Sequence, residues 1–403
     1  MNTRMMTVQE VSFTKVKSSF VFCLFLVWLV ISSVYYIEQL LSGDIVASYE
    51  DSILSKAAKY LIVLSFSLLF LIRAGSVIAP LLIAMLLGVV FIWYVFNPKY
   101  IYLFDGYVVI LTMVGLCSVL GNATYGMIVR LSKVVVFTGV LVSFIAVLEV
   151  SFLSNLYASH WEATGGVRAV STLLNPNNLG VYLGACLILC LAIPGSVLGK
   201  TLSVIVIMIG MYLSGSRTAW LAFVVVFSLW SLRFCMGRAI NTSRLVFVFL
   251  AVFVGVTLAL VLSSQAVEVE RLQDFTSANI RLEKYSIYLN GFGVDYLIPD
   301  LEGVRLYLVS ESSYFLLINA FGLIGLACVA VLVFLLYGFR VTWIPFFPYV
   351  VLYYVVVGLF ENMVNSFPNN QLFLLSLGSI FCLRPFAKQK TDIGLHSARY
   401  STL

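Results

Sequence analysis

Charged residues are scarce in this chain. Only 10% of its 403 residues are Asp, Glu, Lys or Arg, whereas about 25% is usual for a soluble globular domain. Hydrophobic residues make up 62%, and apolar runs of about 20 residues, each long enough to cross a hydrocarbon core as a helix, recur along the whole sequence. The shortage of charge excludes a water-soluble protein and predicts an integral membrane protein.

The apolar runs also lack the polar-apolar alternation of strands, which favours helices that satisfy their own backbone hydrogen bonds. We therefore predict an all-α, polytopic membrane protein in which residues 1–403 form a single membrane domain. It has about twelve transmembrane helices. The predicted spans are 19–37, 57–72, 75–96, 101–120, 134–155, 177–193, 201–214, 218–232, 245–263, 312–336, 342–360 and 367–383.

The distribution of Lys and Arg predicts the orientation, because cytoplasmic loops accumulate these residues. With the N-terminus inside, 15 of the 24 Lys and Arg residues fall in cytoplasmic segments. Both termini are then cytoplasmic, 385–403 is a cytoplasmic tail, and 264–311 is a large periplasmic loop. The net charge of +6 thus reflects topology, and no nucleic-acid partner is expected.

Several other signals are missing. None of the seven cysteines lies in a predicted outer loop, so no disulfide framework is indicated, and no zinc-ligand spacing is present. Cys186 and Cys190 are spaced i,i+4 on one helix, where we interpret them as packing residues. The chain also lacks an internal repeat, which weighs against transporters built from two related halves.

Two outer clusters place arginine beside helix ends. In the segment 165–180, Asn175 can cap a helix that has Pro176 in its first turn, and Arg168 would lie near its positive end. That arrangement suits an anionic ligand such as phosphate, although a plain cap with a loop arginine explains it equally well. Arg217 occupies a very short outer turn, where a charge is expensive without a partner and where a guanidinium suits phosphate oxygens.

Two further clusters belong to the long loop. Residues 278–289 have helical spacing and end at Asn290-Gly291, which predicts a short helix that holds Arg281 over the outer mouth of the bundle. Glu311-Ser312-Ser313-Tyr314 stands where the loop re-enters the membrane. The Glu311 carboxylate is either a general base with a raised pKa or a helix N-terminal acid stabilised by the dipole.

The order of these clusters resembles the O-antigen ligase and O-antigen polymerase (Wzy/WaaL) superfamily of bacterial membrane glycosyltransferases. Four pieces carry the resemblance, over roughly residues 165–384. They are Arg168 with Asn175-Pro176-Asn177 and Leu179-Gly180, then Ser216-Arg217-Thr218-Ala219, then Arg281 through Tyr285 to Gly291 and Gly293, and finally 311–325 with its Gly322-Leu323-Ile324-Gly325.

The resemblance implies a GT-C-like fold in the bacterial inner membrane and a reaction at its periplasmic face. Donor and acceptor are oligosaccharides linked to undecaprenyl diphosphate, and a polysaccharide chain-length regulator is a candidate partner besides membrane lipid. Arg217, Arg281 and Arg168 would bind the diphosphate, with Asn175, Asn177, Tyr285 and Tyr314 as substrate-binding residues. The outer loops contain no Asp-x-Asp pair, so we expect no metal or other cofactor.

One departure favours the polymerase branch. Ligases typically carry a His-Asn pair where this chain has Glu311-Ser312, and its two histidines, His160 and His396, lie elsewhere. We therefore predict a polymerase with Glu311 as the catalytic base. The other outer carboxylates that could take this role instead are Glu162, Asp300, Glu302 and Glu361. The alternatives are an O-antigen ligase, a lipid-linked oligosaccharide flippase or other transporter, and a cell-wall glycan polymerase of the shape, elongation, division and sporulation type, whose motifs we do not find.

Overall fold

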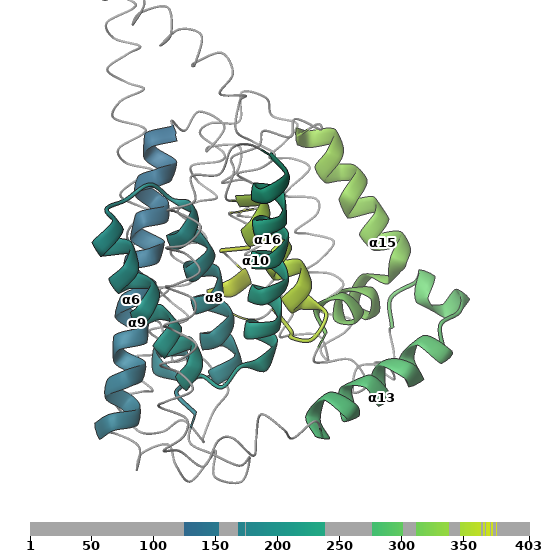
Figure 1. The fold of residues 1–403 in the computed structure, drawn as a ribbon. Helices are drawn as coiled ribbons and strands as arrows, with labels where there is room; N and C mark the ends of the chain where they lie inside the picture. The colour runs from purple at the N-terminus through teal and green to yellow at the C-terminus, as the bar shows by residue number, and fades with distance from the viewer. Residues whose placement is uncertain are drawn as a thin grey trace, which may run out of the picture.

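The computed structural model describes residues 125–152, 168–173, 175–237, 276–300, 312–337 and 347–363, together with a few positions between 366 and 376. This part of the chain is all-helical and contains no strand (Figure 1). Its elements are α6 (Tyr125–Phe152), η3 (Ser171–Leu173), α8 (Pro176–Ala192), α9 (Val197–Leu213), α10 (Arg217–Gly237), α13 (Thr276–Asn290), η4 (Val294–Leu297), α15 (Ser313–Tyr337) and α16 (Phe347–Gly358).

These bounds confirm six predicted helices of the bundle, those expected at 134–155, 177–193, 201–214, 218–232, 312–336 and 342–360, and the loop helix expected at 278–289. The predicted spans 19–37, 57–72, 75–96, 101–120 and 245–263 lie outside the described residues, as do the tail 385–403 and most of the span 367–383.

Helix α8 is the centre of the bundle. It packs against α6, α9, α10 and α16, and every residue from Leu179 to Cys190 is buried. A helix that is apolar on all sides is expected where protein surrounds it completely. The end of α8 that begins at Pro176 therefore stands in the middle of the assembly, and any ligand that reaches it is surrounded by the neighbouring helix ends.

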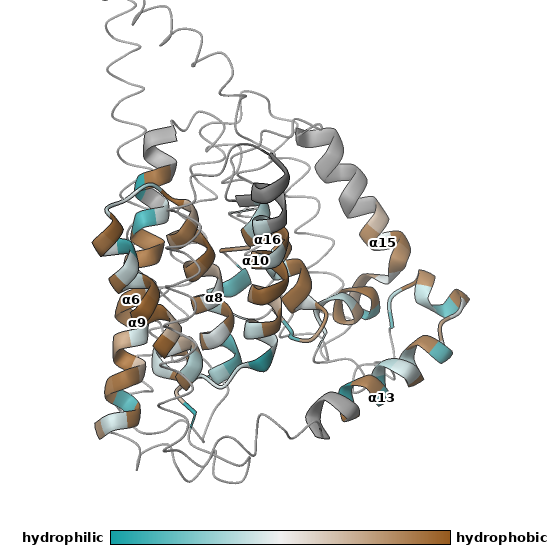
Figure 2. Ribbon diagram, viewed as in Figure 1, coloured by the Kyte–Doolittle hydropathy of each residue, from teal (hydrophilic) through white to brown (hydrophobic). Residues whose placement is uncertain are grey.

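The outer faces of the surrounding helices are apolar. Phe137 and Phe144 of α6, Leu202 of α9 and Leu221 and Val224 of α10 are all exposed. Within the described ranges, Ser132–Phe152 of α6 is the one stretch that is both long and apolar enough to cross a membrane, and α8, α9, α10, α15 and α16 contain shorter apolar segments. Figure 2 shows this hydrophobic character over most of the bundle, with hydrophilic segments gathered at the lower ends of α8 and α10.

Cys186 and Cys190 both face the interior of the bundle. Cys186 is fully buried, and its thiol donates to the carbonyl of Val135 in α6 over 3.5 Å. The Cys190 thiol contacts the carbonyl of Lys200 at 3.9 Å. Their interpretation as packing residues is confirmed.

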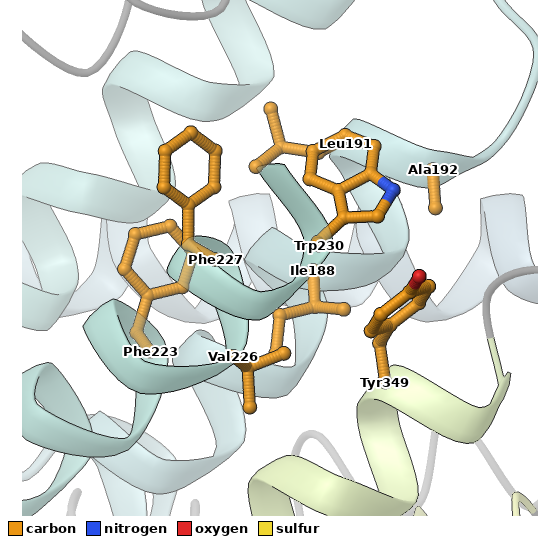
Figure 3. Close-up of a pocket in the computed structure, with 8 residues that line it drawn as sticks. All are labelled: Ile188, Leu191, Ala192, Phe223, Val226, Phe227, Trp230 and Tyr349. Carbon is orange, nitrogen blue, oxygen red and sulfur yellow. The ribbon is translucent and has the colours of Figure 1, made fainter. Parts of the chain in front are cut away.

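A small hollow lies between α8, α10 and α16, at the end of α8 opposite Pro176. Its lining is entirely apolar or aromatic, with Phe223, Phe227 and Trp230 of α10 facing Ile188 of α8 and Tyr349 of α16 (Figure 3). Consecutive rings contact one another along α10 and end on Tyr349, with centroids 5.7 to 6.3 Å apart; Phe223 and Phe227 are stacked, and the other two pairs meet edge to face. The hollow has room for about one water molecule, so we regard it as a packing feature.

The loop elements α13 and η4 dock on the first half of α15 (Figure 1). Tyr288 of α13 is fully buried, its hydroxyl donates to Asn319 Oδ1 over 2.8 Å, and its ring packs on Phe315. Tyr296 of η4 donates in turn to the Tyr288 carbonyl over 3.0 Å. The exposed side chains of α13 include Leu282 and Leu289, so its packed face is the one that carries Tyr285 and Tyr288.

Helix α15 breaks at Gly322, where φ is 66° and ψ is 167°. The break brings the α15 backbone against the end of η4, and a Cβ at position 322 would overlap the Leu297 carbonyl oxygen and the backbone of Ile298. Only glycine adopts this conformation without strain and leaves this space. The break therefore fixes where η4 meets α15.

Candidate functional site

The N-terminus of α8 forms as predicted. The Asn175 side chain accepts hydrogen bonds from the backbone N–H groups of Asn177 at 2.8 Å and Asn178 at 3.3 Å, and Pro176 occupies the first turn. Asn175 therefore satisfies donors that the helix itself cannot pair. Because the cap occupies the Asn175 carbonyl, the next polar side chain, Asn177, is the one that extends toward the neighbouring helix ends.

Arg168 lies against this helix end and is buried. Its Nε donates to the Ser214 carbonyl over 2.7 Å, and its Nη2 donates to Asn177 Oδ1 over 2.7 Å. The short distances are those of charge-assisted hydrogen bonds. Arg168 thus joins the two outer clusters predicted at 165–180 and around Arg217.

A buried carboxylate holds the backbone next to Arg168. Glu149 of α6 is 2% exposed and accepts from the N–H of Ser171 over 2.6 Å and from the N–H of Val170 over 3.1 Å. Ser171 adopts a positive φ of 50°, which is uncommon for a residue other than glycine. The Glu149 carboxylate compensates for this strained turn, and the turn sets the direction from which Arg168 approaches.

The turn between α9 and α10 packs very closely on α8. A Cβ at Gly180 would overlap the side chains of Ser214 and Ser216. Arg217 is the first residue of α10 and is half-buried. The close packing places the first turn of α10 beside the first turn of α8.

Glu361 lies at the centre of these helix ends. It follows α16 in a turn, where its N–H donates to the Val357 carbonyl over 2.9 Å. Its Oε1 accepts from Thr218 Oγ1 at 3.2 Å and forms an ion pair with Arg281 Nη1 at 3.4 Å. Its Oε2 accepts from Asn177 Nδ2 at 3.3 Å. One carboxylate therefore contacts α8, α10 and α13.

The backbone around Glu361 is fixed by hydrogen bonds of its own. Ser313, the first residue of α15, donates from Oγ to the Glu361 carbonyl over 2.8 Å and accepts from the N–H of Met363 over 2.7 Å. Asn369 Nδ2 donates to the Asn178 carbonyl over 3.0 Å and ties the following segment to α8. The segment that carries Glu361 is therefore bonded to α15 and to α8.

Tyr314 binds the backbone of α16, and Tyr285 binds the backbone of the turn that follows it. The Tyr285 hydroxyl donates to the Leu359 carbonyl over 2.8 Å, and the Tyr314 hydroxyl donates to the Val355 carbonyl over 2.7 Å. These bonds fasten α13 and α15 to the segment that carries Glu361. Their predicted role in binding sugar stays a prediction, as does that of Asn175.

The structure brings together Arg168, Asn177 and Arg281 of the predicted site and places Arg217 next to Thr218, a contact residue of Glu361. Glu311, the predicted base, lies outside the described residues and stays a prediction. Sequence reasoning did not single out Thr218, although it lies inside the Ser216–Ala219 motif. Glu361 directly follows the predicted span 342–360, and that position was the signal that could have favoured it over the other outer carboxylates.

Chemically, the cluster combines permanent cations with a carboxylate and neutral donors. Arg168 and Arg281 supply planar guanidinium groups, which match phosphate oxygens. Asn177 and Thr218 supply an amide and a hydroxyl suited to sugar hydroxyl groups. Such a set can hold an anionic, hydroxyl-rich ligand and offers a carboxylate that can accept a proton.

Comparison with known proteins gives no match: no protein-family model, no curated protein and no solved structure corresponds to this chain. The arguments for function therefore come from the site.

Proposed function

We propose that this protein is a membrane glycosyltransferase of the O-antigen polymerase type, which joins oligosaccharide repeat units carried on undecaprenyl diphosphate. The single observation that carries the proposal is the convergence on Glu361. Each of the four motif pieces supplies one contact to this residue, through Asn177, Thr218, Arg281 and Ser313. The four pieces thus act as parts of one site.

The proposal includes the topology of about twelve spans in the bacterial inner membrane, with both termini cytoplasmic and residues 264–311 periplasmic. This topology is supported by which helix ends lie together. The first residues of α8, α10 and α15 contact the segment after the last residue of α16. All four ends were predicted to be periplasmic from the distribution of Lys and Arg, and a wrong alternation of spans would have separated them.

The arginines would bind the lipid diphosphate, which is the leaving group. Charge on the diphosphate increases as the bond to the sugar breaks, and preorganised guanidinium donors stabilise that charge most in the transition state. Arg281 reaches the site from the loop helix, Arg168 from the segment before α8, and Arg217 from the start of α10. The three arginines thus come from three different segments of the chain, and the N-terminus of α8 adds a fourth positive element.

The test is reconstitution. Purified protein in lipid vesicles is given the repeat unit on undecaprenyl diphosphate, and products are resolved as a ladder of glycan lengths. We expect a ladder from the wild-type protein and none from the same repeat unit on undecaprenyl monophosphate. Transfer to lipid A-core without a ladder would establish a ligase, and movement of the donor across the bilayer without new linkages would establish a flippase; either result would overturn the proposal.

A further inference from the structure

We infer that Glu361 is the general base of this reaction, the group that takes the proton from the acceptor sugar hydroxyl. The inference rests on the proposed function and deepens it. It assigns to a described residue the role that sequence reasoning gave to Glu311. The juxtaposition that carries it is a partly exposed carboxylate held between Arg281, Thr218 and Asn177.

Glu361 differs from the other carboxylates of the described residues in its surroundings. Five lie in the described part of the chain, and Glu149 is the clearest contrast to Glu361 because its oxygens are committed to two backbone N–H groups and it is 2% exposed. Asp300 is also buried, on the docked side of the loop. Glu283 and Asp295 are exposed side chains of α13 and η4. Glu361 is the carboxylate of this set that contacts Arg281 and Asn177.

The contacts of Glu361 also differ in length from those of Glu149. The contacts of Glu361 with Thr218, Asn177 and Arg281 measure 3.2, 3.3 and 3.4 Å, whereas a charge-assisted hydrogen bond is typically about 2.7–2.9 Å. The Ser171 N–H lies 2.6 Å from Glu149, so the two carboxylates differ clearly. These three contacts orient the Glu361 carboxylate, and the side chain remains 15% exposed.

Glu361 is linked to two of the arginines. Arg281 contacts it directly, and Arg168 reaches it through Asn177, whose oxygen accepts from Arg168 and whose nitrogen donates to Glu361. A diphosphate bound by these guanidinium groups lies beside the carboxylate. A phosphate oxygen also competes with Glu361 Oε1 for Arg281, so that donor binding loosens the ion pair at the point where the acceptor arrives.

Glu361 removes the proton from the acceptor hydroxyl while that oxygen forms a bond to the anomeric carbon of the donor sugar. The bond from the anomeric carbon to the diphosphate oxygen breaks, and its electron pair leaves with undecaprenyl diphosphate. The arginines stabilise the additional negative charge, and the protonated Glu361 then releases its proton to water. No oxidant, reductant or metal is needed.

The experiment uses the full-length protein in vesicles with the same lipid-linked repeat unit. Glu361→Gln keeps the size and the hydrogen-bond acceptor of the side chain but cannot take the proton. We expect donor binding within a fewfold of wild type and a rate of polymer formation lower by about 10²–10⁴. Glu361→Asp should retain more activity than Glu361→Gln. The matched control is Glu283→Gln, an exposed carboxylate on the helix of Arg281, which should polymerise normally.

A second readout separates a base from a merely structural carboxylate. In Glu361→Ala, added formate should restore part of the polymerisation rate, because a small carboxylate can enter the space that the side chain leaves and accept the proton. Loss of donor binding in Glu361→Gln together with no rescue by formate would make Glu361 a structural residue and overturn the inference.

The outcomes also distinguish Glu361 from Glu311 as the base, and failure of this inference from failure of the proposed function. A wild-type ladder with normal polymerisation by Glu361→Gln, and its loss in Glu311→Gln, would return the role to Glu311 and leave the proposed function intact. A wild-type protein that binds donor but makes no ladder would overturn the proposed function, and the inference with it.

Discussion

The carboxylate of Glu149 accepts a 2.6 Å hydrogen bond from the backbone N–H of Ser171, across two segments that are separated by 22 positions in the sequence. Inside an apolar bundle, such a bond is strong and expensive to leave unmade. Because Ser171 has a positive φ, the turn depends on this partner. The pair thereby fixes the position of the backbone beside Arg168.

Replacing this carboxylate should therefore cost stability and activity together. In Glu149→Gln, one amide N–H₂ faces backbone donors that the carboxylate accepted, and we expect a loss of about 1.5–3 kcal/mol in the free energy of unfolding. Thermal unfolding in detergent measures it. Glu283→Gln, on an exposed site, should change stability by less than about 0.5 kcal/mol; equal effects from the two variants would show that the bonds to Ser171 and Val170 contribute little.

Arginine at positions 217 and 281 should not be replaceable by lysine. A lysine keeps the charge but loses the planar fork that binds two phosphate oxygens. We expect Arg217→Lys and Arg281→Lys each to lower the polymerisation rate by about a hundredfold, equivalent to roughly 3 kcal/mol. Arg130→Lys, at an exposed position of α6, is the control. Normal glycan ladders from both lysine variants at normal protein levels would end the assignment of these residues to diphosphate.

Gly180 should tolerate no side chain. An added methyl group overlaps Ser214 and Ser216 and would push the α9–α10 turn, with Arg217, away from α8. We expect Gly180→Ala to destabilise the protein by about 1–3 kcal/mol, as overpacking does. At Gly195, by contrast, the nearest atoms to an added Cβ are side-chain carbons of Lys200 at 3.6 and 3.7 Å. Gly195→Ala should be neutral in the same unfolding assay, and similar losses in both variants would contradict the packing argument.

The orientation can be tested with single cysteines introduced after the seven native ones are replaced. A membrane-impermeant thiol reagent added outside should label Asp274→Cys in the periplasmic loop and leave Lys390→Cys unlabelled until the membrane is opened. Labelling of position 390 and protection of position 274 would invert the topology. Such a result would place the Glu361 cluster on the cytoplasmic side and would rule out a periplasmic reaction.

Local features of this protein were predictable from sequence. The cap of α8 depends on Asn175 and Pro176, which are adjacent to the helix that they start, and the bounds of α8 and α15 follow from the length of the apolar runs. Helix α13 follows from the spacing within 278–289. In each case the physical cause acts over one or two helical turns, so a single sequence contains it.

The partners of Glu361 could not be predicted in the same way. The contact of Asn177 with Glu361 joins residues 184 positions apart, and that of Thr218 joins residues 143 apart. No local pattern encodes which helix ends meet, because this depends on how the helices pack around α8. The positive φ of Ser171 was also not predictable from the sequence, since its partner is a carboxylate on another helix.

The distance along the chain between the two halves of the site also sets an order in which they arise during biosynthesis. Arg168 and Asn177 are nine positions apart and can meet as soon as α8 is inserted. Glu361 is translated 184 residues after Asn177, a delay of roughly 10 to 40 seconds at ordinary rates of translation of about 5–20 residues per second. A nascent chain therefore has Arg168 and Asn177 well before Glu361, and a chain interrupted in between contains this part of the polar cluster without its carboxylate.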